Sequence, residues 1–397
     1  MVSKDRVLFV GAGPSQAPAI EHAKTLGYEV YAIDSNPNAE GFQHVAGSDV
    51  GDIRDPEFIR NCAQRYDVSG IVAVSTDAPV PAIARASDSL GLPSISISAA
   101  DISVNKLLQR NYFKAAGLRI PKYMSFRNVE EAINSAYDVG FPMVVKPTDS
   151  SGSRGVSLVS SEKELKKAAE EALSVSRSKV GILEEYVDGT EVSVEGFVLD
   201  GVFHELCMSE KTRTLPPYLL DTEVCFPDSI VTEEHETIIA IAKKAILACG
   251  LNNCPVHMEL LRSENGPVVV ELAARGAGFR VFTNIIPYVT GVDTIDIQLK
   301  LALGKKVEML MKKPLRGAVI SFLSPIPGKL KCVKGIDLAK DVPGVQEAQV
   351  YIEAGTLMGE LKSGSDRIGH VIVFGDSRIE AKMRAKIALS LIKFELE

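Results

Sequence analysis

Two glutamates in the second half of the chain stand among apolar residues that have the pattern of short strands. Glu259 lies in the segment VHMELL and Glu271 in VVVELAAR, and the turn sequence SENG separates the two segments. A carboxylate among apolar side chains costs free energy unless a cation or a metal ion compensates its charge. Carboxylate oxygens are hard ligands that suit Mg²⁺, an ion that often bridges a protein and substrate phosphates. The pair is therefore a candidate magnesium site.

The two carboxylates can bind one ion only if both lie on the same face of the hairpin. A three-residue loop from Glu264 to Gly266, with Gly266 in the left-handed conformation, would place Glu259 directly opposite Glu271. A two-residue turn would shift the pairing by one residue and separate the two carboxylates. We therefore predict the three-residue loop.

Arg275 follows Glu271 by four residues, in the segment AARGAGF. A guanidinium at this spacing lies within reach of a phosphate held by the metal ion, and the glycine-rich backbone after it can also hold an anion. The alternative is a structural salt bridge between Arg275 and one of the two glutamates.

A serine- and glycine-rich loop separates two strand-like segments in VVKPTDSSGSRGVSLV, residues 144–159. Its amides and hydroxyls can surround phosphate oxygens, and Lys146 adds a positive charge. It is not a P-loop, because no Gly-Lys-Ser/Thr sequence opens a helix. We predict a mobile phosphate-binding lid, with an ordinary mobile hairpin as the alternative. Further along, the acidic hinge GILEEYVDGTEVSVEG can present backbone groups to an adenine edge while a carboxylate binds a ribose hydroxyl.

The N-terminal segment VGAGPSQAP resembles the start of a dinucleotide-binding domain. A hydrophobic strand runs into Gly-Ala-Gly, and the next strand ends at Asp34. The third glycine of the fingerprint is replaced by Gln16, so the match is partial. A simple tight turn is the alternative.

Strand-like and helix-like segments alternate from Arg6 to about Ser98, which predicts a parallel sheet with helices on both faces. After Pro121 the pattern becomes mixed, and from about Leu315 a smaller unit ends in the strand IGHVIVFG and an amphipathic helix. The segment SEKTRTLPPYLLDTEVCFP, residues 209–227, has the polar and proline content of a surface loop rather than a strand. We expect this loop to contribute to a substrate pocket.

The composition narrows the class of protein. A net charge of −7 over 397 residues argues against the basic face of a nucleic-acid-binding protein. The longest apolar runs have the length of strands, and none approaches the ~20 residues of a membrane span. The N-terminus leads directly into a strand rather than a signal peptide. The six cysteines form no CxxC pair and are typical of reduced thiols. We therefore expect a cytoplasmic protein with no nucleic-acid or membrane partner.

In their order along the chain, these features resemble the ATP-grasp superfamily, and the resemblance extends over nearly the whole sequence. The closing segment SGSDRIGHVIVFGDSRIEA is similar to the C-terminal domain of the biotin-carboxylase-like and L-amino-acid-ligase branches. The resemblance implies an α/β fold with a Rossmann-like parallel-sheet domain over residues 1–98. An ATP-grasp domain of two α+β subdomains would follow over 99–310, with its lid at about 120–188, and a small α+β domain over 311–397. The residues that carry the resemblance are Lys106, Lys146, the loop at 150–155, LEEYVDGTE at 183–191, Glu259, Glu271 and Arg275.

The resemblance also implies a role for each residue. Lys106 and Lys146 would contact ATP phosphates, and Arg275 would act with Lys146 on the transferring phosphoryl group. Glu259 and Glu271 would bind Mg²⁺ or Mn²⁺. The further ATP contacts would be Ser150, Ser151, Gly152, Ser153 and Gly155 in the covering loop, Glu184, Glu185 and Val187 at the adenine, and Glu191 at the ribose.

The chain departs from the family pattern at one position. Many members have Glu-x-Asn-x-Arg where this chain has ELAAR, so Ala273 replaces the asparagine that commonly helps to hold a second metal ion. In the predicted register His257 faces Ala273 and is a candidate to hold a water molecule there, with a plain strand histidine as the alternative. Arg213 and Arg280 are candidate contacts to an anionic substrate, with solvated surface charge as the alternative.

The activity that the resemblance implies is an ATP-dependent, ADP-forming carboxylate–amine ligase that works through an acylphosphate, with an amino acid as the favoured carboxylate. One alternative is a purine-pathway or carbamoyl-phosphate-type enzyme that uses formate or bicarbonate, and another is a non-catalytic nucleotide-binding protein. The N-terminal Gly-Ala-Gly loop would face substrate or an anion rather than NAD, with Asp34 as a turn residue. The partners would be small carboxylate and amine substrates, and a homodimer is one option for the assembly.

Overall fold

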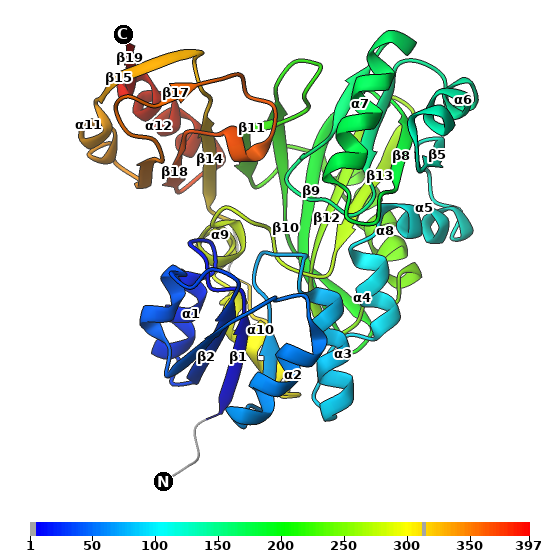
Figure 1. Ribbon diagram of the computed structural model, residues 1–397. Coiled ribbons are helices and arrows are strands. Elements are labelled where there is room, and N and C mark those ends of the chain that lie inside the picture. Colours follow the sequence, from blue (N-terminus) through cyan, green and yellow to red (C-terminus); the bar gives the residue numbers. More distant parts are fainter. Residues whose placement is uncertain (1–4, 312–314) are drawn as a thin grey trace.

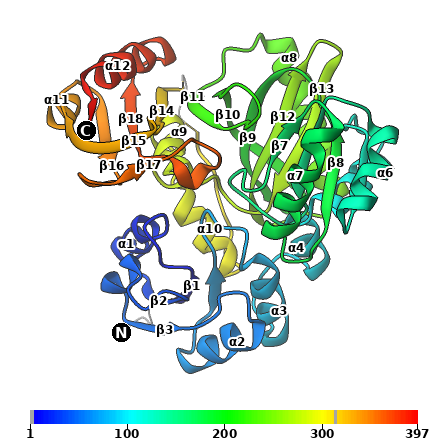
Figure 2. The ribbon, with the colours of Figure 1, turned by 45° about the horizontal axis from the view of Figure 1, so that its top comes forward.

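Three lobes surround a central region in the computed structural model, which describes residues 5–311 and 315–397 (Figures 1 and 2). The N-terminal lobe is blue in Figure 1, the lid is cyan and green, and the C-terminal lobe is orange and red. A long antiparallel sheet runs from the central region into the C-terminal lobe.

The N-terminal lobe is a parallel sheet with the strand order β3-β2-β1-β4. Its strand β1 is apolar and almost wholly buried, as expected of a parallel strand with helices on both faces. Much later in the chain, α10 returns to this lobe, where the Gln298 amide donates to the Ala73 carbonyl at 2.8 Å. The predicted parallel sheet is therefore confirmed. Its elements are β1 (Arg6–Val10), α1 (Ala17–Thr25), β2 (Glu29–Asp34), a 3₁₀ helix (Glu40–His44), β3 (Gly47–Val50), α2 (Pro56–Arg65), β4 (Gly70–Val72), α3 (Val80–Leu90) and α10 (Thr294–Ala302).

The lid is a four-stranded antiparallel sheet with the order β5-β8-β6-β7, and two helices cover one of its faces. Alanines on the inner faces of these helices let them pack closely on Met143 and Leu183. The elements are β5 (Tyr123–Phe126), α6 (Val129–Val139), β6 (Met143–Pro147), β7 (Ser157–Val159), α7 (Glu162–Val175) and β8 (Gly181–Glu185). The helices α4 (Ile97–Ser103) and α5 (Lys106–Ala115) connect the N-terminal lobe to the lid.

The central sheet has eight strands in the order β13-β12-β9-β10-β11-β14-β18-β16, and every pair is antiparallel. The C-terminal lobe therefore continues the central sheet through the pairing of β11 with β14. The strands are β9 (Thr190–Leu199), β10 (Val202–Arg213), β11 (Asp221–Phe226), β12 (Cys254–Ser263), β13 (Gly266–Ala273), β14 (Gly317–Leu323), β16 (Val345–Val350) and β18 (Gly369–Gly375).

Helices pack on both ends of the central sheet. The helix α8 packs with α5 on the apolar face of β9 and β12, and α12 packs on β14 and β18. A small sheet with the order β17-β15-β19 completes the C-terminal lobe. The remaining elements are α8 (Thr232–Ala248), a short π-helix (Val281–Ile285), α9 (Ile286–Thr290), β15 (Gly328–Lys334), α11 (Ile336–Lys340), β17 (Leu357–Met358), a 3₁₀ helix (Gly364–Asp366), α12 (Arg378–Leu391) and β19 (Lys393–Leu396).

The segment 209–227 differs from its prediction as a surface loop. Its first part belongs to β10 and its last part to β11, and the two strands pair from Glu210 opposite Cys225. Only residues 214–220 form a loop. The polar side chains misled the sequence argument because several of them face a cavity instead of solvent.

The hairpin of β12 and β13 reaches the predicted register by a different route. Ser263 pairs with Gly266, so the turn has two residues and the predicted three-residue loop is wrong. A bulge between Val269 and Glu271 then shifts the pairing by one residue, and Glu259 lies opposite Glu271 as predicted. Gly266 has φ +100°, which agrees with the predicted positive value.

Among the described residues, no helix combines the length and the apolar character needed to cross a bilayer.

Candidate active site

A cavity of about 390 Å³ lies where the lid, the central sheet, the N-terminal lobe and the first C-terminal strand meet. Its volume lies within the range typical of small-molecule sites. Most of the site residues predicted from the sequence line this cavity, and they come from helix α5, the lid, the central sheet and the segments that follow them. They are Lys106, Lys146, Ser150, Ser151, Gly152, Ser153, Glu184, Glu185, Val187, Glu191, Arg213, Glu259, Glu271 and Arg275.

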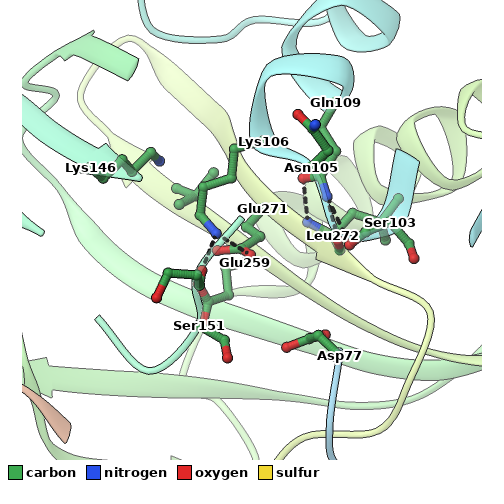
Figure 3. Close-up of polar contacts among 12 residues, drawn as sticks. Asp77, Ser103, Asn105, Lys106, Gln109, Lys146, Ser151, Glu259, Glu271 and Leu272 are labelled. Atoms are coloured by element: carbon green, nitrogen blue, oxygen red, sulfur yellow. Dashed lines mark hydrogen bonds and ion pairs between the residues drawn. The ribbon is translucent and has the colours of Figure 1, made fainter. Parts of the chain in front are cut away.

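Lys106 begins helix α5 and joins the loop at 150–155 to the hairpin of β12 and β13. Asn105 caps this helix by accepting from the amides of Leu107 and Leu108. The Lys106 ammonium donates to Glu271 Oε1 at 2.8 Å and to the Ser150 carbonyl at 2.7 Å. Figure 3 shows its side chain between Glu271 and the loop that carries Ser151. The cap thus fixes the position from which the Lys106 ammonium extends into the cavity.

A buried triad positions Lys146. Glu184 accepts from the Lys146 ammonium at 2.7 Å and forms a 2.7 Å ion pair with Arg110 Nε. Burial alone would raise the pKa of Glu184, but Arg110 and Lys146 outweigh burial and lower this pKa to about 2. Burial, with help from Arg110 and Lys106, lowers the pKa of Lys146. Glu184 is therefore ionised and fixes Lys146 at the wall of the cavity.

Lys211 was not predicted from the sequence, yet it connects several acidic residues of the site. Its ammonium lies 2.6 Å from Glu191 Oε1 and 3.4 Å from Asp221 Oδ2, and it also contacts Glu259. The three carboxylates outweigh burial and raise the pKa of Lys211 well above its ordinary value. Arg213 adds a 2.9 Å contact to Glu191 Oε2. The alternation of β10 could have revealed Lys211, because Ser209, Lys211 and Arg213 share one face of the strand.

His257 lies opposite Ala273, as predicted, and close to Glu259. Its Nδ1 lies 2.6 Å from Glu195 Oε1 and its Nε2 lies 3.3 Å from Glu259 Oε1. Burial alone would lower the pKa of His257, but Glu195 and Glu259 raise it to about 9. The two carboxylates therefore favour the protonated imidazole, which lies across the strand pair from Ala273, the position where the family pattern has asparagine.

Arg275 pairs with Asp77 rather than with either glutamate. Its Nε and Nη2 donate to the two carboxylate oxygens of Asp77 at 2.8 and 2.9 Å. Asp77 belongs to the loop between β4 and α3, where Ser75 also donates to the Ala277 carbonyl at 2.7 Å. The alternative predicted from the sequence, a salt bridge between Arg275 and one of the two glutamates, is therefore wrong, because the partner is Asp77. Asp77 was missed because nothing near it in the sequence indicates a long-range partner.

One end of the cavity is apolar. Phe279 and Phe322 pack edge to face with ring centres 4.9 Å apart, and the Arg367 guanidinium lies 3.6 Å from the centre of the Phe322 ring. Arg367 is 9% exposed, and its Nη2 donates to the Asp221 carbonyl at 2.7 Å. Among the described residues, its Nε has no hydrogen-bond partner. The other apolar residues at this end are Val224, Phe226, Val281 and Ile320.

Three sequence predictions lie outside the cavity wall. Gly155, the last residue of the loop at 150–155, packs beside Val175. Arg280 contacts Glu347 at 3.4 Å and the Pro14 carbonyl at 3.3 Å, and it does not line the cavity. The N-terminal Gly-Ala-Gly loop is also absent from the lining, and the Ala12 amide donates to Asp34 Oδ2 at 2.7 Å.

The side chains present fit a polyanionic ligand and a divalent cation. Besides Arg367 Nε, the buried polar atoms of the lining that have no hydrogen-bond partner among the described residues include Ser150 Oγ, Ser193 Oγ, Glu195 Oε2 and Ser209 Oγ. No three His, Cys, Asp or Glu side chains in the described part of the chain are arranged as ligands of one metal ion. Two carboxylates with phosphate oxygens and waters are the usual ligand set of Mg²⁺, and Glu259 and Glu271 can supply the protein's share.

Comparisons with known proteins agree with this geometry. Residues 139–283 match the ATP-grasp domain and residues 321–397 match the L-amino acid ligase C-terminal domain 2. The chain therefore contains an ATP-grasp domain and a C-terminal domain of the L-amino acid ligase type.

Particular relatives fall into two groups. An alanine–anticapsin ligase of Bacillus subtilis strain 168 is 27% identical over 281 residues, which are 64% of this chain and 59% of that protein. A formate-dependent phosphoribosylglycinamide formyltransferase of Saccharolobus solfataricus is 26% identical over 412 residues, covering 98% of this chain and 96% of that protein. The crystal structure of an L-amino acid ligase from Bacillus licheniformis has the same fold, with a TM-score of 0.84 at 20% identity over 100% of this chain and 99% of that one.

Proposed function

We propose that this chain is an ATP-dependent, ADP-forming carboxylate–amine ligase that activates an amino acid or a related small carboxylate as an acylphosphate. The observation that carries the proposal is that a single cavity has two chemically different ends. Lysines and paired glutamates form one end, aromatic and aliphatic side chains form the other, and Arg275, whose side chain is 14% exposed, belongs to the same wall. A phosphoryl donor and an organic acceptor can therefore meet at Arg275.

The polar end would bind the triphosphate. Lys106 and Lys146 would turn from their carboxylate partners toward phosphate oxygens, and the loop at 150–155 would close over them with its amides and hydroxyls. Glu259 and Glu271 would hold Mg²⁺. When bound, this ion supplies positive charge that neutralises the nucleotide phosphates during transfer.

The adenine would be contacted by backbone groups, and the ribose would be contacted by a side chain. The hinge at Glu185 and Val187 would present its backbone to the adenine. Glu191 would accept a hydrogen bond from a ribose hydroxyl, while Lys211 and Arg213 hold its carboxylate in place. Glu184 would be a positioning residue for Lys146, because both of its oxygens are engaged by cations.

Arg275 would stabilise the charge that develops on the transferring phosphoryl group. Two hydrogen bonds to Asp77 fix its guanidinium plane before any substrate arrives. A donor that is fixed in advance stabilises a transition state without the cost of reorganisation. Asp77 would thus be the positioning residue of the phosphoryl-transfer step.

The apolar end of the cavity distinguishes between the candidate substrates, which are an amino acid and a small acid such as formate or bicarbonate. Similarity over almost the full length to a formate-dependent formyltransferase supports an enzyme that uses formate or bicarbonate as a second candidate. Neither of these small acids has an apolar part that would contact Phe279, Phe322 and their neighbours. An amino acid with a side chain would bury apolar area there, at roughly 25 cal/mol per Å². The amino-acid ligase is therefore the first proposal.

A screen with ATP and Mg²⁺ tests the activity. Pairs of amino acids and amines, together with formate and bicarbonate, would be examined for ADP release and for the coupled product by mass spectrometry. We expect ADP to be released with an amino acid and an amine, and a peptide or amide to form in equal amount. ATP binding without substrate-dependent ADP release in any mixture would instead indicate a non-catalytic nucleotide-binding protein.

A further inference from the structure

A second cavity, of about 330 Å³, lies beside the first, between the lid and the N-terminal lobe. The two cavities share a wall at the point where the phosphoryl group would be transferred. The shared residues are Asp77, Lys106, Ser150, Ser151 and Glu271. A group bound in the second cavity would therefore lie next to the activated carboxylate.

Three arginines from separate segments line this second cavity. Arg54 belongs to the loop between β3 and α2, Arg154 to the covering loop and Arg177 to the loop between α7 and β8. The first comes from the N-terminal lobe and the other two from the lid. Segments far apart in the sequence thus bring guanidinium groups to one place in a chain whose net charge is −7.

The arginines keep donors available for a ligand. Arg54 pairs with Asp52 through two hydrogen bonds of 2.8 and 3.0 Å. Arg154 donates to the Ser151 carbonyl at 3.1 Å, and no ion pair within 4.0 Å joins Arg154 or Arg177 to a carboxylate of the described residues. The guanidinium of Arg has five N–H donors in a fork that fits carboxylate and phosphate oxygens.

The acidic residues in the lining offset only part of this positive charge, through the Asp149 carboxylate, which interacts with the charge of Arg177. Glu271 is paired with Lys106, and Asp77 is paired with Arg275. Asp149 accepts from the Ser178 amide at 2.8 Å. The buried Ser150 hydroxyl, which lies in the shared wall, has no hydrogen-bond partner among the described residues. The second cavity therefore combines guanidinium donors with a hydroxyl that lacks a partner.

We propose that the second cavity binds an anionic group beside the reacting carboxylate, held by Arg54, Arg154 and Arg177. This inference rests on the proposed ligase function for its place in the reaction. The group is a carboxylate of the amine substrate or the phosphate released from the acylphosphate. Both are planar or tetrahedral oxyanions that guanidinium groups bind with charge-assisted hydrogen bonds.

Binding of inorganic phosphate in the presence of Mg²⁺ and a non-hydrolysable ATP analogue tests the site without turnover. The analogue fills the central cavity, so labelled phosphate in equilibrium dialysis reports on the second cavity. We expect Arg54→Gln/Arg177→Gln to raise the dissociation constant of phosphate roughly tenfold or more, the effect of losing charge-assisted hydrogen bonds. Arg127→Gln is the control, because Arg127 is an exposed lid arginine away from both cavities, and it should leave binding within about twofold.

Competition separates the two sources of the anion. Displacement of bound phosphate by amino acids identifies the site with the carboxylate of the amine substrate. Phosphate that stays bound at saturating amino acid identifies it with the released product. A wild-type protein that binds no phosphate beside the analogue, or a double variant that binds it as tightly as wild type, would overturn the proposal. Failure of ADP release in the substrate screen, with phosphate binding intact, would count against the ligase function alone.

Discussion

Each lysine of the central cavity contacts at least one carboxylate. Lys106 contacts Glu271, Lys146 contacts Glu184, and Lys211 contacts Glu191 and Glu259. Pairing of this kind allows many charged side chains to lie close together in the folded protein, because an unpaired buried charge costs several kcal/mol. It also means that the proposed binding of nucleotide would exchange one set of ionic contacts for another.

Replacement of Glu271 by Gln tests the metal-site hairpin at the level of one side chain. The amide keeps the shape of the side chain but removes the charge that would hold Mg²⁺, so we expect turnover to fall by roughly a thousandfold or more. ADP release measures the effect, and circular dichroism checks the fold. Glu264→Gln, in the exposed turn of the same hairpin, is the control and should retain normal activity. Normal ADP release from the Glu271 variant would remove this residue from the mechanism.

The buried triad predicts a pH-dependent contribution to stability. The folded-state pKa of Glu184 is about 2, below its ordinary value of 4.5. The stabilisation is therefore fully present above about pH 4.5 and is lost as the pH falls through about 2. We expect Glu184→Gln to lower the free energy of unfolding by about 3–5 kcal/mol near neutral pH, because Arg110 and Lys146 lose their counter-charge.

Urea unfolding near neutral pH and in the acid range measures this effect. The difference between wild type and Glu184→Gln should narrow as the pH falls below about 4.5. Glu170→Gln, on the exposed face of α7, provides the baseline. A difference that stays constant down to the lowest pH would show that Glu184 is not ionised in the folded protein.

Predicted site residues that belong to a local motif line the same cavity in the structure. Lys146, the glycine-rich loop, Glu259 and Glu271 stand in short segments whose residue types indicate phosphate or metal binding, and the structure brings them together. The alternation of β10 places Lys211 on the same face as Arg213 but does not identify its carboxylate partners, and Asp77 was missed because its partner Arg275 is many residues away. Long-range ion pairs leave no signal in the local pattern.

At the scale of elements, the β12–β13 hairpin shows how the same register can arise in two ways. The alternation of side chains indicates which residues must share a face, but it does not say where an extra residue is accommodated. The chain uses a two-residue turn and a bulge at Val270. A bulge changes the face of the sheet toward which the following side chains point, but it does not change the composition of the strand. The sequence pattern therefore could not reveal it.

The covering loop at 150–155 should change its mobility when nucleotide binds. Gly152, Ser153 and Gly155 all have positive φ, and one hydrogen bond, from the Gly364 amide to the Gly152 carbonyl at 3.3 Å, joins its centre to the C-terminal lobe. We expect rapid amide exchange in this loop and slower exchange with Mg-ADP, because phosphate oxygens would accept from its amides.

Hydrogen exchange read by mass spectrometry measures this change. The interior of α12 serves as the internal control and should show no difference. Equal exchange of the loop with and without nucleotide would mean that it does not close over phosphates.

At the scale of the whole molecule, the continuous sheet joins the ATP-grasp core to the C-terminal lobe. The pairing of β11 with β14 covers an edge that would otherwise expose unpaired backbone groups. The sequence predicted the N-terminal parallel sheet because alternating strands and helices follow one another locally. It could not predict this junction, because a strand pair formed across a long stretch of chain has no local signature.

Truncation tests the junction. A chain that ends at Arg316 lacks β14 and exposes both the edge of β11 and the apolar residues Val224 and Phe226. We expect it to aggregate or to be recovered mainly in the insoluble fraction, whereas the full chain elutes as a defined species in size-exclusion chromatography. A truncated chain that stays well folded and elutes normally would show that the C-terminal lobe is an independent appendage.

The acylphosphate is the central claim, and transfer of oxygen from substrate to phosphate tests it most directly. Amino acids labelled with ¹⁸O in the carboxylate would be incubated with Mg-ATP and the amine partner found in the substrate screen, and the released phosphate would be analysed by mass spectrometry. The account predicts ADP and phosphate that carries one ¹⁸O atom for each bond formed, because the carboxylate oxygen attacks the γ-phosphoryl group and leaves with it. Formation of AMP and pyrophosphate, or of phosphate without ¹⁸O alongside a coupled product, would contradict it.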